Sequence, residues 1–335
     1  MRMIRKIGVL LSICAVLCSC SRMNQLPAST GQPYEVVLEG DTDHVISQIL
    51  TEDIPGLPQS ESLCNIIRVR KGKVQGSYLM VRTRVVVDID KRYNKFSAKV
   101  SKDEVASPQL VIRIKAKSVE QLRATFYDKN GKVNKNGEEL CALINQSELE
   151  HLATVIRQNP AKQREVKRMF GLDMKIPASM DASKKEKGFL WLSNNANSGM
   201  QSLVIFRLKG NGCAEPNGWT YNLNEINQVL KSHILGETDN MHMRLVSRDE
   251  DEEKDENLFS MERGLWDMKG DAMGGPYLLK VLPMNNGKIV TPRSYHEQLG
   301  RIDSRIVVIG FVYAPEMKKR NLIKQLEAVL TTVKY

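Results

Sequence analysis

The sequence of 335 residues has few aromatic residues and few histidines, and it lacks the short motifs of several enzyme classes. Its five histidines are far apart and form no His-Glu-x-x-His or His-x-His pattern, so nothing indicates a zinc site. It has no Gly-x-Ser-x-Gly elbow, no phosphate loop ending in Gly-Lys, and no Gly-x-Gly-x-x-Gly after a strand. We therefore expect no metal and no cofactor.

Long hydrophobic runs are also missing. Only residues 7–18 are apolar and uncharged, which is too short to cross a bilayer and excludes a protein with several membrane spans. Three basic residues precede this run, and the sequence Leu-Cys-Ser-Cys at residues 17–20 follows it. This arrangement is typical of a secretory signal with a lipobox. It predicts a signal peptide at residues 1–19 and lipidation of Cys20; an uncleaved anchor helix and a signal cut elsewhere are the alternatives.

The expected location follows from this N-terminus. Residues 20–33 would form the lipidated N-terminus and a tether, since they are rich in Pro, Ser and Gly. No acidic cluster follows Cys20, so we predict a lipid anchor at the periplasmic face of the outer membrane. Loss of the signal lowers the formal charge from +10 to +7. A nucleic-acid partner is not expected in this compartment, whereas an envelope protein or a glycan is possible.

Three cysteines remain in the mature chain, namely Cys64, Cys141 and Cys213. Their spacing matches no metal or redox motif. They are interpreted either as small buried hydrophobic residues or as one disulfide with one free thiol.

The fold class predicted from hydrophobic periodicity is α/β (α+β), with two sheet-plus-helix sandwich halves, each with its helices on one face. The N-terminal α/β half covers residues 34–137, and a helical connector covers residues 138–171. The C-terminal α/β half covers residues 172–335, starts with a strand near residues 173–176 and ends in an amphipathic helix.

Three strand candidates in the N-terminal half alternate apolar with basic residues. A period of two sends the charges to one face of a sheet. The residues predicted to form this basic face are Arg68, Arg70, Arg82, Arg84, Arg113, Lys115 and Lys117. Such a face could hold anionic lipid headgroups, glycan phosphates or an acidic partner, or it could be an ordinary solvent-exposed face.

A glycine cluster at residues 270–276 is the best candidate for a binding loop, because glycines let backbone N–H groups approach a ligand. Acidic and aromatic residues of the kind that bind sugars surround it. The candidate binding residues are Trp266, Asp267, Gly270, Asp271, Gly274, Gly275 and Tyr277. The alternative interpretation is a tight bend between two strands.

Several of these segments resemble a lipoprotein family of the Bacteroidota that is known only as a domain of unknown function. The resemblance rests on the motifs GDAMGGP at residues 270–276, GFVYAP at 310–315, KRNLI at 319–323 and DIPGLPQS at 53–60. It covers nearly the whole mature chain. The family has no assigned reaction, so the resemblance implies an envelope lipoprotein without identifying catalytic residues.

The leading hypothesis is therefore a non-enzymatic binding or scaffold protein of the cell envelope that faces the periplasm. The alternative is a hydrolase or transferase acting on envelope glycans, with Asp267 or Asp271 as the acid or base beside Trp266. A third hypothesis places the basic face against anionic headgroups.

Overall fold

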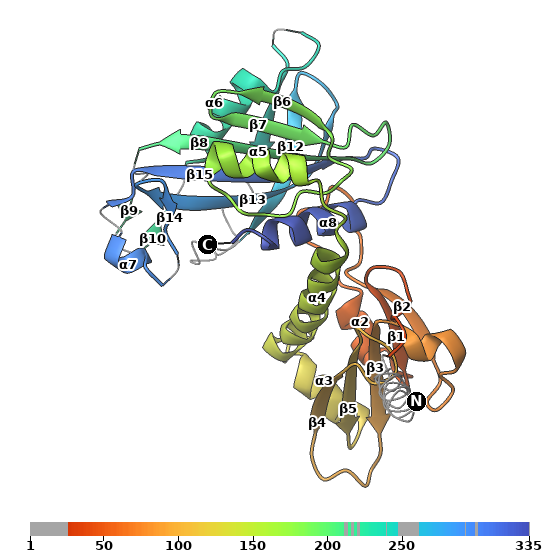
Figure 1. Ribbon diagram of the computed structural model, residues 1–335. Coiled ribbons are helices and arrows are strands. Elements are labelled where there is room, and N and C mark those ends of the chain that lie inside the picture. The colour runs from red at the N-terminus through yellow and green to blue at the C-terminus, as the bar shows by residue number, and fades with distance from the viewer. Residues whose placement is uncertain are drawn as a thin grey trace, which may run out of the picture. The chain divides into compact units, whose positions relative to one another are not determined.

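The computed structural model describes residues 26–210, 214–215, 218–219, 222–238, 240–246, 261–291, 293–298 and 301–334 (Figure 1). The predicted signal peptide, Cys20, Cys213 and the acidic run at residues 249–256 lie outside the described residues. The fold is α+β, as predicted, with two separate main sheets. No helix in the described ranges is long and apolar enough to cross a membrane.

The chain divides into two compact units. The first consists of the described residues up to His44 together with residues 66–123, and the second consists of residues 45–65 and 124–335. This division differs from the boundaries expected at residues 137 and 171. The long helices at residues 135–155 and 160–170 fall within the second unit.

The first unit contains a five-stranded sheet with the order β2-β1-β3-β5-β4. Strands β1, β3 and β5 are parallel, and β4 is antiparallel to β5. The elements are β1 (Glu35–Glu39), β2 (Asn65–Val69), the 3₁₀ helix η1 (Gly76–Met80), β3 (Thr83–Ile89), β4 (Ser97–Lys102), β5 (Leu110–Ala116) and α3 (Val119–Phe126), whose last residues enter the second unit. The alternating pattern buries Val85, Val87, Ile112 and Ile114 on one face of the sheet.

The second unit contains an eight-stranded antiparallel sheet with the order β11-β12-β13-β15-β8-β7-β6, and β14 pairs with β13. The strands are β6 (Ala182–Glu186), β7 (Phe189–Ser193), β8 (Met200–Lys209), β11 (His242–Val246), β12 (Glu262–Lys269), β13 (Gly274–Asn285), β14 (Lys288–Ile289) and β15 (Ser304–Tyr313). A separate two-stranded ribbon is formed by β9 (Ala214–Glu215) and β10 (Gly218–Trp219). Residues 173–176, predicted as a strand, contribute only isolated bridges, because Asp173 pairs with Lys334 and the neighbouring Pro177 pairs with Gln158.

Helices cover both faces of this large sheet, which corrects the expectation of helices on one face. On one face, α5 (Pro160–Phe170) and α8 (Arg320–Thr331) pack over Leu203, Ile306 and other apolar residues (Figure 1). On the other face, α6 (Leu223–His233) packs over a second core that contains Phe206 and Ile309. The remaining helices are α2 (Val45–Leu50), α4 (Lys135–Val155) and the short α7 (Tyr295–Gln298). Strong burial of β13 and β15 follows, since apolar layers lie on both sides of them.

The C-terminal amphipathic helix is present as α8, and it begins at Arg320, several residues after Pro315. Its apolar stripe, which includes Ile323, Leu326 and Leu330, is buried in the core as expected. Its charged side is buried as well, because Lys324 and Glu327 are each about 3% exposed. A helix with both sides buried needs charged partners inside the protein.

Candidate functional site

The glycine cluster forms the hairpin that joins β12 to β13. Gly270 has a φ of +89°, a conformation that favours glycine, and Asp271 accepts a hydrogen bond from the Ala272 backbone N–H at 2.6 Å. Gly274 and Gly275 lie inside β13, opposite Asp267 and Trp266 of β12. The alternative interpretation of a tight bend between strands therefore describes this segment.

Both aromatic residues of the predicted binding loop lie in the hydrophobic core. Trp266 is 2% exposed, and its indole Nε1–H donates to the Val312 carbonyl oxygen at 3.1 Å. Tyr277 is 3% exposed, and its ring lies against Gly264, where a Cβ would meet the ring at 2.7 Å. Neither ring can stack against a sugar unless the sheet opens.

The two acidic residues of this region are engaged locally. Asp267 accepts two hydrogen bonds from Arg244 of the neighbouring strand, at 2.6 and 2.8 Å. The hydrogen bond to Asp267 raises the pKa of Arg244 above its ordinary value. Asp271 lies on the exposed turn of the hairpin, bonded to its own backbone segment.

The predicted basic face is brought together only in part. Arg84, Arg113 and Lys115 share one face of the sheet, because Arg84 lies opposite Val111 in the register and residues 111, 113 and 115 alternate on β5. Carboxylates lie among these charges: Arg84 is 3.7 Å from Glu39, and Arg113 forms a two-pronged ion pair with Glu104.

The other four members of that predicted face lie elsewhere. Arg82 precedes β3, is buried, and donates to the Gln32 carbonyl oxygen at 3.1 Å. Arg68 on β2, Arg70 just after it, and Lys117 just after β5 are exposed to solvent. The sequence pattern did not identify β4, whose lysines lie beside Arg113 and Lys115.

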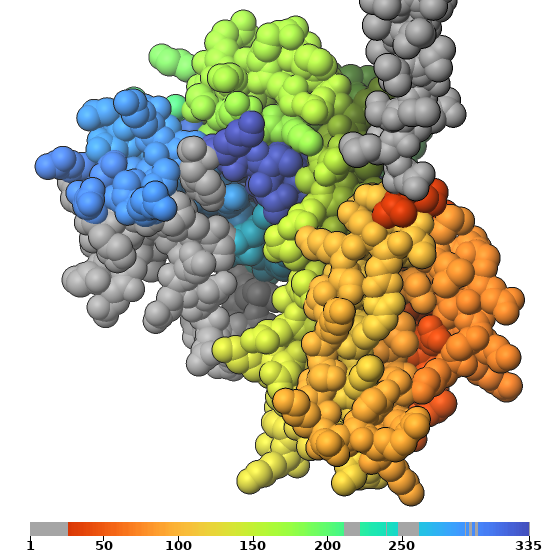
Figure 2. All heavy atoms as spheres, turned by 60° about the horizontal axis from the view of Figure 1, so that its bottom comes forward, coloured from red at the N-terminus to blue at the C-terminus, as the bar shows by residue number. Residues whose placement is uncertain are grey.

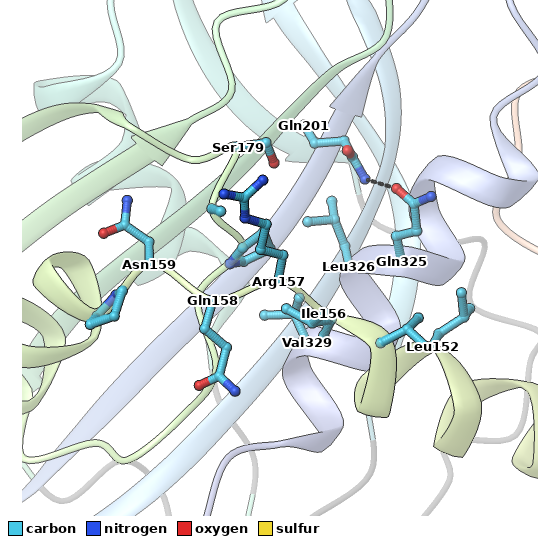
Figure 3. A pocket seen from close by; sticks show the side chains of 14 residues that line it. Leu152, Ile156, Arg157, Gln158, Asn159, Ser179, Gln201, Gln325, Leu326 and Val329 are labelled. Atoms are coloured by element: carbon cyan, nitrogen blue, oxygen red, sulfur yellow. Dashed lines mark hydrogen bonds between the residues drawn. The ribbon is translucent and has the colours of Figure 1, made fainter.

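A pocket of about 810 Å³ lies on the second unit, between the end of α4, the start of α5 and α8 (Figure 3). No expectation from the sequence pointed to it. The residues that line it are Leu152, Val155, Ile156, Arg157, Gln158, Asn159, Pro160, Pro177, Ala178, Ser179, Gln201, Gln325, Leu326 and Val329. Of the described residues that form this lining, none is Asp, Glu, His or Cys.

Local sequence signals build one wall of this pocket. Asn159 caps α5 by accepting from the Lys162 N–H at 3.2 Å, and Pro160 occupies the first turn. The chain at residues 157–159 runs beside the segment at residues 176–178. The Asn159 N–H donates to the Ile176 carbonyl, and the Ala178 N–H donates to the Arg157 carbonyl. Two short backbone bonds, at 2.8 and 2.7 Å, therefore hold the wall in place.

The floor of the pocket is apolar and its rim is polar. Leu326 and Val329 of α8 are about 1% exposed and belong to the core. On the rim, Gln201 Nε2 donates to Gln325 Oε1 at 3.1 Å and to the Leu322 carbonyl at 2.9 Å (Figure 3). This pairing leaves Gln201 Oε1 as an acceptor and Gln325 Nε2 as a donor on the rim of the pocket.

Arg157 and Ser179 supply the remaining polar groups. Both are exposed, and neither side chain forms a hydrogen bond or ion pair within the described part of the chain. Both residues line the pocket, and in the view of Figure 3 the Arg157 guanidinium and the Ser179 hydroxyl lie on the same side of it. A guanidinium and a hydroxyl in this arrangement suit a carboxylate, which accepts hydrogen bonds at both oxygens.

A buried ion cluster holds α4 and α8 together next to the pocket. Glu327 accepts from Arg263 of β12 at 2.6 and 2.9 Å and lies 3.0 Å from Lys324 Nζ. Lys324 also donates to Asn145 Oδ1 of α4 at 2.6 Å. Burial alone would raise the pKa of Glu327, but Arg263 and Lys324 outweigh burial and lower it. Burial lowers the pKa of Lys324, with Glu327 opposing the shift.

A second polar contact fixes the start of α8. The Glu61 carboxylate accepts from the backbone N–H groups of Lys319 and Arg320, at 2.6 and 3.1 Å, so an acidic side chain meets the positive end of the helix dipole. The Arg320 guanidinium donates in turn to the Ser62 carbonyl and to Asn65 Oδ1. Two segments named in the resemblance, near residues 53–60 and 319–323, are therefore neighbours in space.

The described cysteines, Cys64 and Cys141, are free thiols. Burial raises the pKa of Cys64 to about 12 and that of Cys141 to about 11, so both remain protonated at neutral pH. Across the described ranges, no group of three His, Cys, Asp or Glu side chains could hold a metal ion.

This geometry defines an α+β protein with an apolar pocket rimmed by amides. The family model described as domain of unknown function DUF4837 matches residues 159–332, and the model described as domain of unknown function DUF8532 matches residues 29–157. The first model covers more than half of the chain, which therefore belongs to the DUF4837 family. No curated protein and no solved structure matches the chain. The two matched regions meet at the pocket wall beside Gln158.

We predict that Gly275→Ala lowers the free energy of unfolding by about 3 kcal/mol or more, because its Cβ would lie 2.1 Å from the Val312 carbonyl oxygen. Gly310→Ala, on the adjacent strand, is the matched control. Its Cβ would meet the Leu326 Cβ at 3.3 Å and the Cδ1 atoms of Leu326 and Leu330 at 3.5 Å, and these side-chain contacts should cost about 1 kcal/mol. Urea unfolding of both variants measures the difference in their free energies of unfolding. An equal loss of stability in the two variants would contradict the proposed clash between the Cβ at position 275 and the Val312 carbonyl.

We also predict that Glu327→Gln costs about 3 kcal/mol of stability, because it leaves the buried Lys324 and the partly buried Arg263 without a carboxylate. Since the folded pKa of Glu327 is lowered, its ionisation stabilises the fold above the ordinary glutamate pKa of about 4.3. This contribution is lost as the pH falls through the folded pKa. Urea midpoints measured between pH 7 and pH 3 should fall further in the wild type than in Glu327→Gln, which retains only the loss from other carboxylates with lowered pKa values, such as Asp88 and Glu104.

The exposed Glu316 offers a matched control for that measurement. Glu316→Gln removes the same charge and should leave the midpoints and their pH dependence close to those of the wild type. A loss of stability in Glu316→Gln as large as in Glu327→Gln would show that net charge, and not the buried cluster, sets the stability.

Proposed function

We propose that this protein is a lipid-anchored peptide-binding protein of the cell envelope, and that the pocket between α4, α5 and α8 holds its ligand. The observation that carries the proposal is the placement of Arg157 and Ser179, both without a partner among the described residues, at one side of an apolar pocket. The ligand would be a short extended segment with an apolar side chain and a free carboxylate.

Each group of the pocket has a role in this proposal. The Leu326 and Val329 side chains take the apolar side chain of the ligand, and the adjacent Gln201 acceptor and Gln325 donor bond its backbone. The Arg157 guanidinium binds the carboxylate through a charge-assisted hydrogen bond. A pocket of about 810 Å³ is in the size range of small-ligand sites and would hold a few residues.

Binding is favoured over the glycan hydrolase or transferase alternative for two reasons. The pocket lining supplies hydrogen-bonding groups and one cation, but no side chain with the pKa of a general acid or base. Of the residues that the alternative names, Asp267 is bonded to Arg244 and Trp266 is in the core, and Asp271 lies on the exposed hairpin turn outside the pocket lining.

The envelope location is part of the same proposal and rests on the sequence of the N-terminus. A basic n-region, an apolar run and a cysteine after small residues support export and lipidation at Cys20. Because Ala28 and Thr30 pair with Ser107 and Val81 of the first unit, residues 20–27 would then be the segment that tethers it to the periplasmic face of the outer membrane.

We expect Arg157→Gln to weaken binding of a carboxylate-ended peptide about tenfold to a hundredfold, through loss of a charge-assisted hydrogen bond. The probe is a fluorescent library of N-acetylated tripeptides with an apolar central residue, measured by anisotropy. The same library with amidated C-termini should bind the wild type more weakly, and Arg157→Gln should no longer distinguish the two libraries.

Arg164→Gln is the matched control, because Arg164 is an exposed arginine of α5 outside the pocket lining. It should bind both libraries like the wild type. Equal binding of carboxylate and amide peptides by the wild type would contradict the role of Arg157, and the absence of any peptide binding would contradict the proposed function.

For the anchor, we expect Cys20→Ala to abolish labelling with a palmitate analogue in cells and to move the protein from the membrane to the soluble fraction. Cys18→Ala, which alters a neighbouring cysteine of the signal, should remain labelled. Continued labelling of Cys20→Ala would show that this cysteine carries no lipid.

A further inference from the structure

The net charge of the predicted mature chain, +7, lies almost entirely on the first unit. Residues 26–44 and 66–123 contain 15 basic and 9 acidic residues, whereas residues 45–65 and 124–335 contain 30 of each. The first unit therefore has a formal charge of +6 on 77 residues, and the second unit is neutral. A charge confined to one unit gives that unit an electrostatic preference for an anionic partner.

Four exposed lysines concentrate this charge on one side of β4 and β5, and we call them the lysine patch: Lys95, Lys99, Lys115 and Lys117. Lys99 lies opposite Arg113, and Lys115 lies opposite Ser97, so Lys99 and Lys115 project from the same face of the sheet. Lys95 and Lys117 follow at the adjoining ends of the two strands. Figure 2 shows the gold-coloured region that contains these strands on the surface of the unit.

The charges of the lysine patch are not neutralised by the protein. The side chains of Lys95, Lys99 and Lys117 form no ion pair or hydrogen bond in the part of the chain that the structure describes. Lys115 lies over the Tyr93 ring, 5.3 Å from its centroid, which leaves its charge available to an anion.

The acidic side chains nearest in the register already have partners. Glu104 pairs with Arg113 through two hydrogen bonds. Asp88 lies opposite Lys115 in the register, but it bonds to Lys71 and to the Tyr93 hydroxyl. These bonds lower the pKa of Asp88, although burial opposes them. Glu104 is thus engaged with Arg113, and Asp88 is shared between Lys71, the Tyr93 hydroxyl and the charge of Lys115. Lys95, Lys99 and Lys117 have no carboxylate partner among the described residues.

We propose that the lysine patch binds the phosphate groups of an anionic phospholipid surface and holds the first unit against the membrane. The inference rests on the proposed lipid anchor. Ala28 and Thr30 already pair with Ser107 and Val81 of the first unit, so residues 20–27 would keep this unit within about 30 Å of the bilayer when fully extended. Within that reach the anchor raises the effective concentration of headgroups at the patch. Lysine ammonium groups suit headgroup phosphates, which they bind as mobile point charges.

The second unit is left free to bind its ligand in this arrangement, since its neutral charge gives it no attraction to the same surface. Each basic residue near an anionic membrane increases partitioning by roughly fivefold, and salt weakens the effect. Four lysines together therefore predict a steep dependence of membrane binding on both charge and ionic strength.

The test uses the unlipidated mature chain, residues 21–335, with vesicles of phosphatidylethanolamine and phosphatidylglycerol at a ratio of seven to three. Flotation at 50 mM NaCl should show binding that falls at least tenfold at 300 mM NaCl, and no binding to vesicles of phosphatidylcholine alone. The variant with all four patch lysines changed to glutamine should lose at least tenfold of the binding at 50 mM NaCl.

The matched control removes the same charge from the second unit by changing Lys129, Lys187, Lys288 and Lys318 to glutamine, all four being exposed. This variant should bind the anionic vesicles like the wild type. An equal loss in the two variants would overturn the proposal in favour of a general charge effect. Equal binding to neutral and anionic vesicles would overturn it as well.

A second measurement uses the lipidated chain in the same vesicles. The lysines are acylated by a water-soluble ester, and the rate at each lysine is measured by mass spectrometry. The rate at the patch lysines should be at least threefold lower in anionic vesicles than in neutral vesicles, whereas the rate at the four control lysines should not change. Unchanged acylation of the patch would overturn the proposal, in which case its lysines serve only to keep the edge strand β4 from pairing with other chains.

The two proposals can fail separately. The vesicle assay with the unlipidated chain requires neither Cys20 nor the pocket, and the peptide assay requires no membrane. Vesicle binding without fatty-acid labelling would contradict the lipid anchor and support the role of the lysine patch. Fatty-acid labelling without protection of the patch lysines would support the anchor and contradict the role of the patch.

Discussion

The second unit depends on α8, because this helix buries an apolar side and a charged side at the same time. Its apolar side completes the core over the large sheet and provides the floor of the pocket through Leu326 and Val329. On its charged side, Glu327 binds Arg263 of β12, and Lys324 donates a hydrogen bond to Asn145 of α4. Buried ions tolerate few arrangements, since an unpaired charge inside a protein is costly. The cluster therefore fixes how α4 lies on α8, and that arrangement opens the pocket at the end of α4.

The two units have different surface chemistry, and this difference suits two different partners. The first unit is basic and exposes lysines on β4 and β5, whereas the second is neutral and has a hollow with an apolar floor. Electrostatic attraction acts over about a Debye length and needs little shape complementarity, which suits a membrane surface. An apolar pocket with a few directed polar groups acts at contact and selects a ligand by shape. Under the proposed function, the second unit binds a soluble ligand while the first unit remains at the membrane.

The glycine cluster shows that a sequence motif can be required for close packing and need not belong to a binding site. Gly275 leaves room for the Val312 carbonyl, and the same carbonyl accepts the hydrogen bond of the buried Trp266 indole. Gly264 likewise leaves room for the Tyr277 ring. Small residues next to large aromatic ones therefore let β12, β13 and β15 pack closely at this end of the sheet. The same residue types around a ligand would have produced a similar sequence, which is why the pattern alone could not separate a sugar site from a hairpin.

The sequence by itself determined the α+β class, the order of most strands and helices, the division near Pro160 and the apolar stripe of α8, because these follow from local periodicity and capping. It also contains the basic pattern of β5, but it did not reveal β4, whose short polar sequence carries no apolar alternation. The pocket, the ion cluster around Glu327 and the burial of Trp266 were decided only by the tertiary structure. Their members come from segments more than 60 residues apart, as with Arg263 and Glu327 or Gln201 and Gln325, and no local pattern records which distant side chains will meet when helices cover both faces of one sheet.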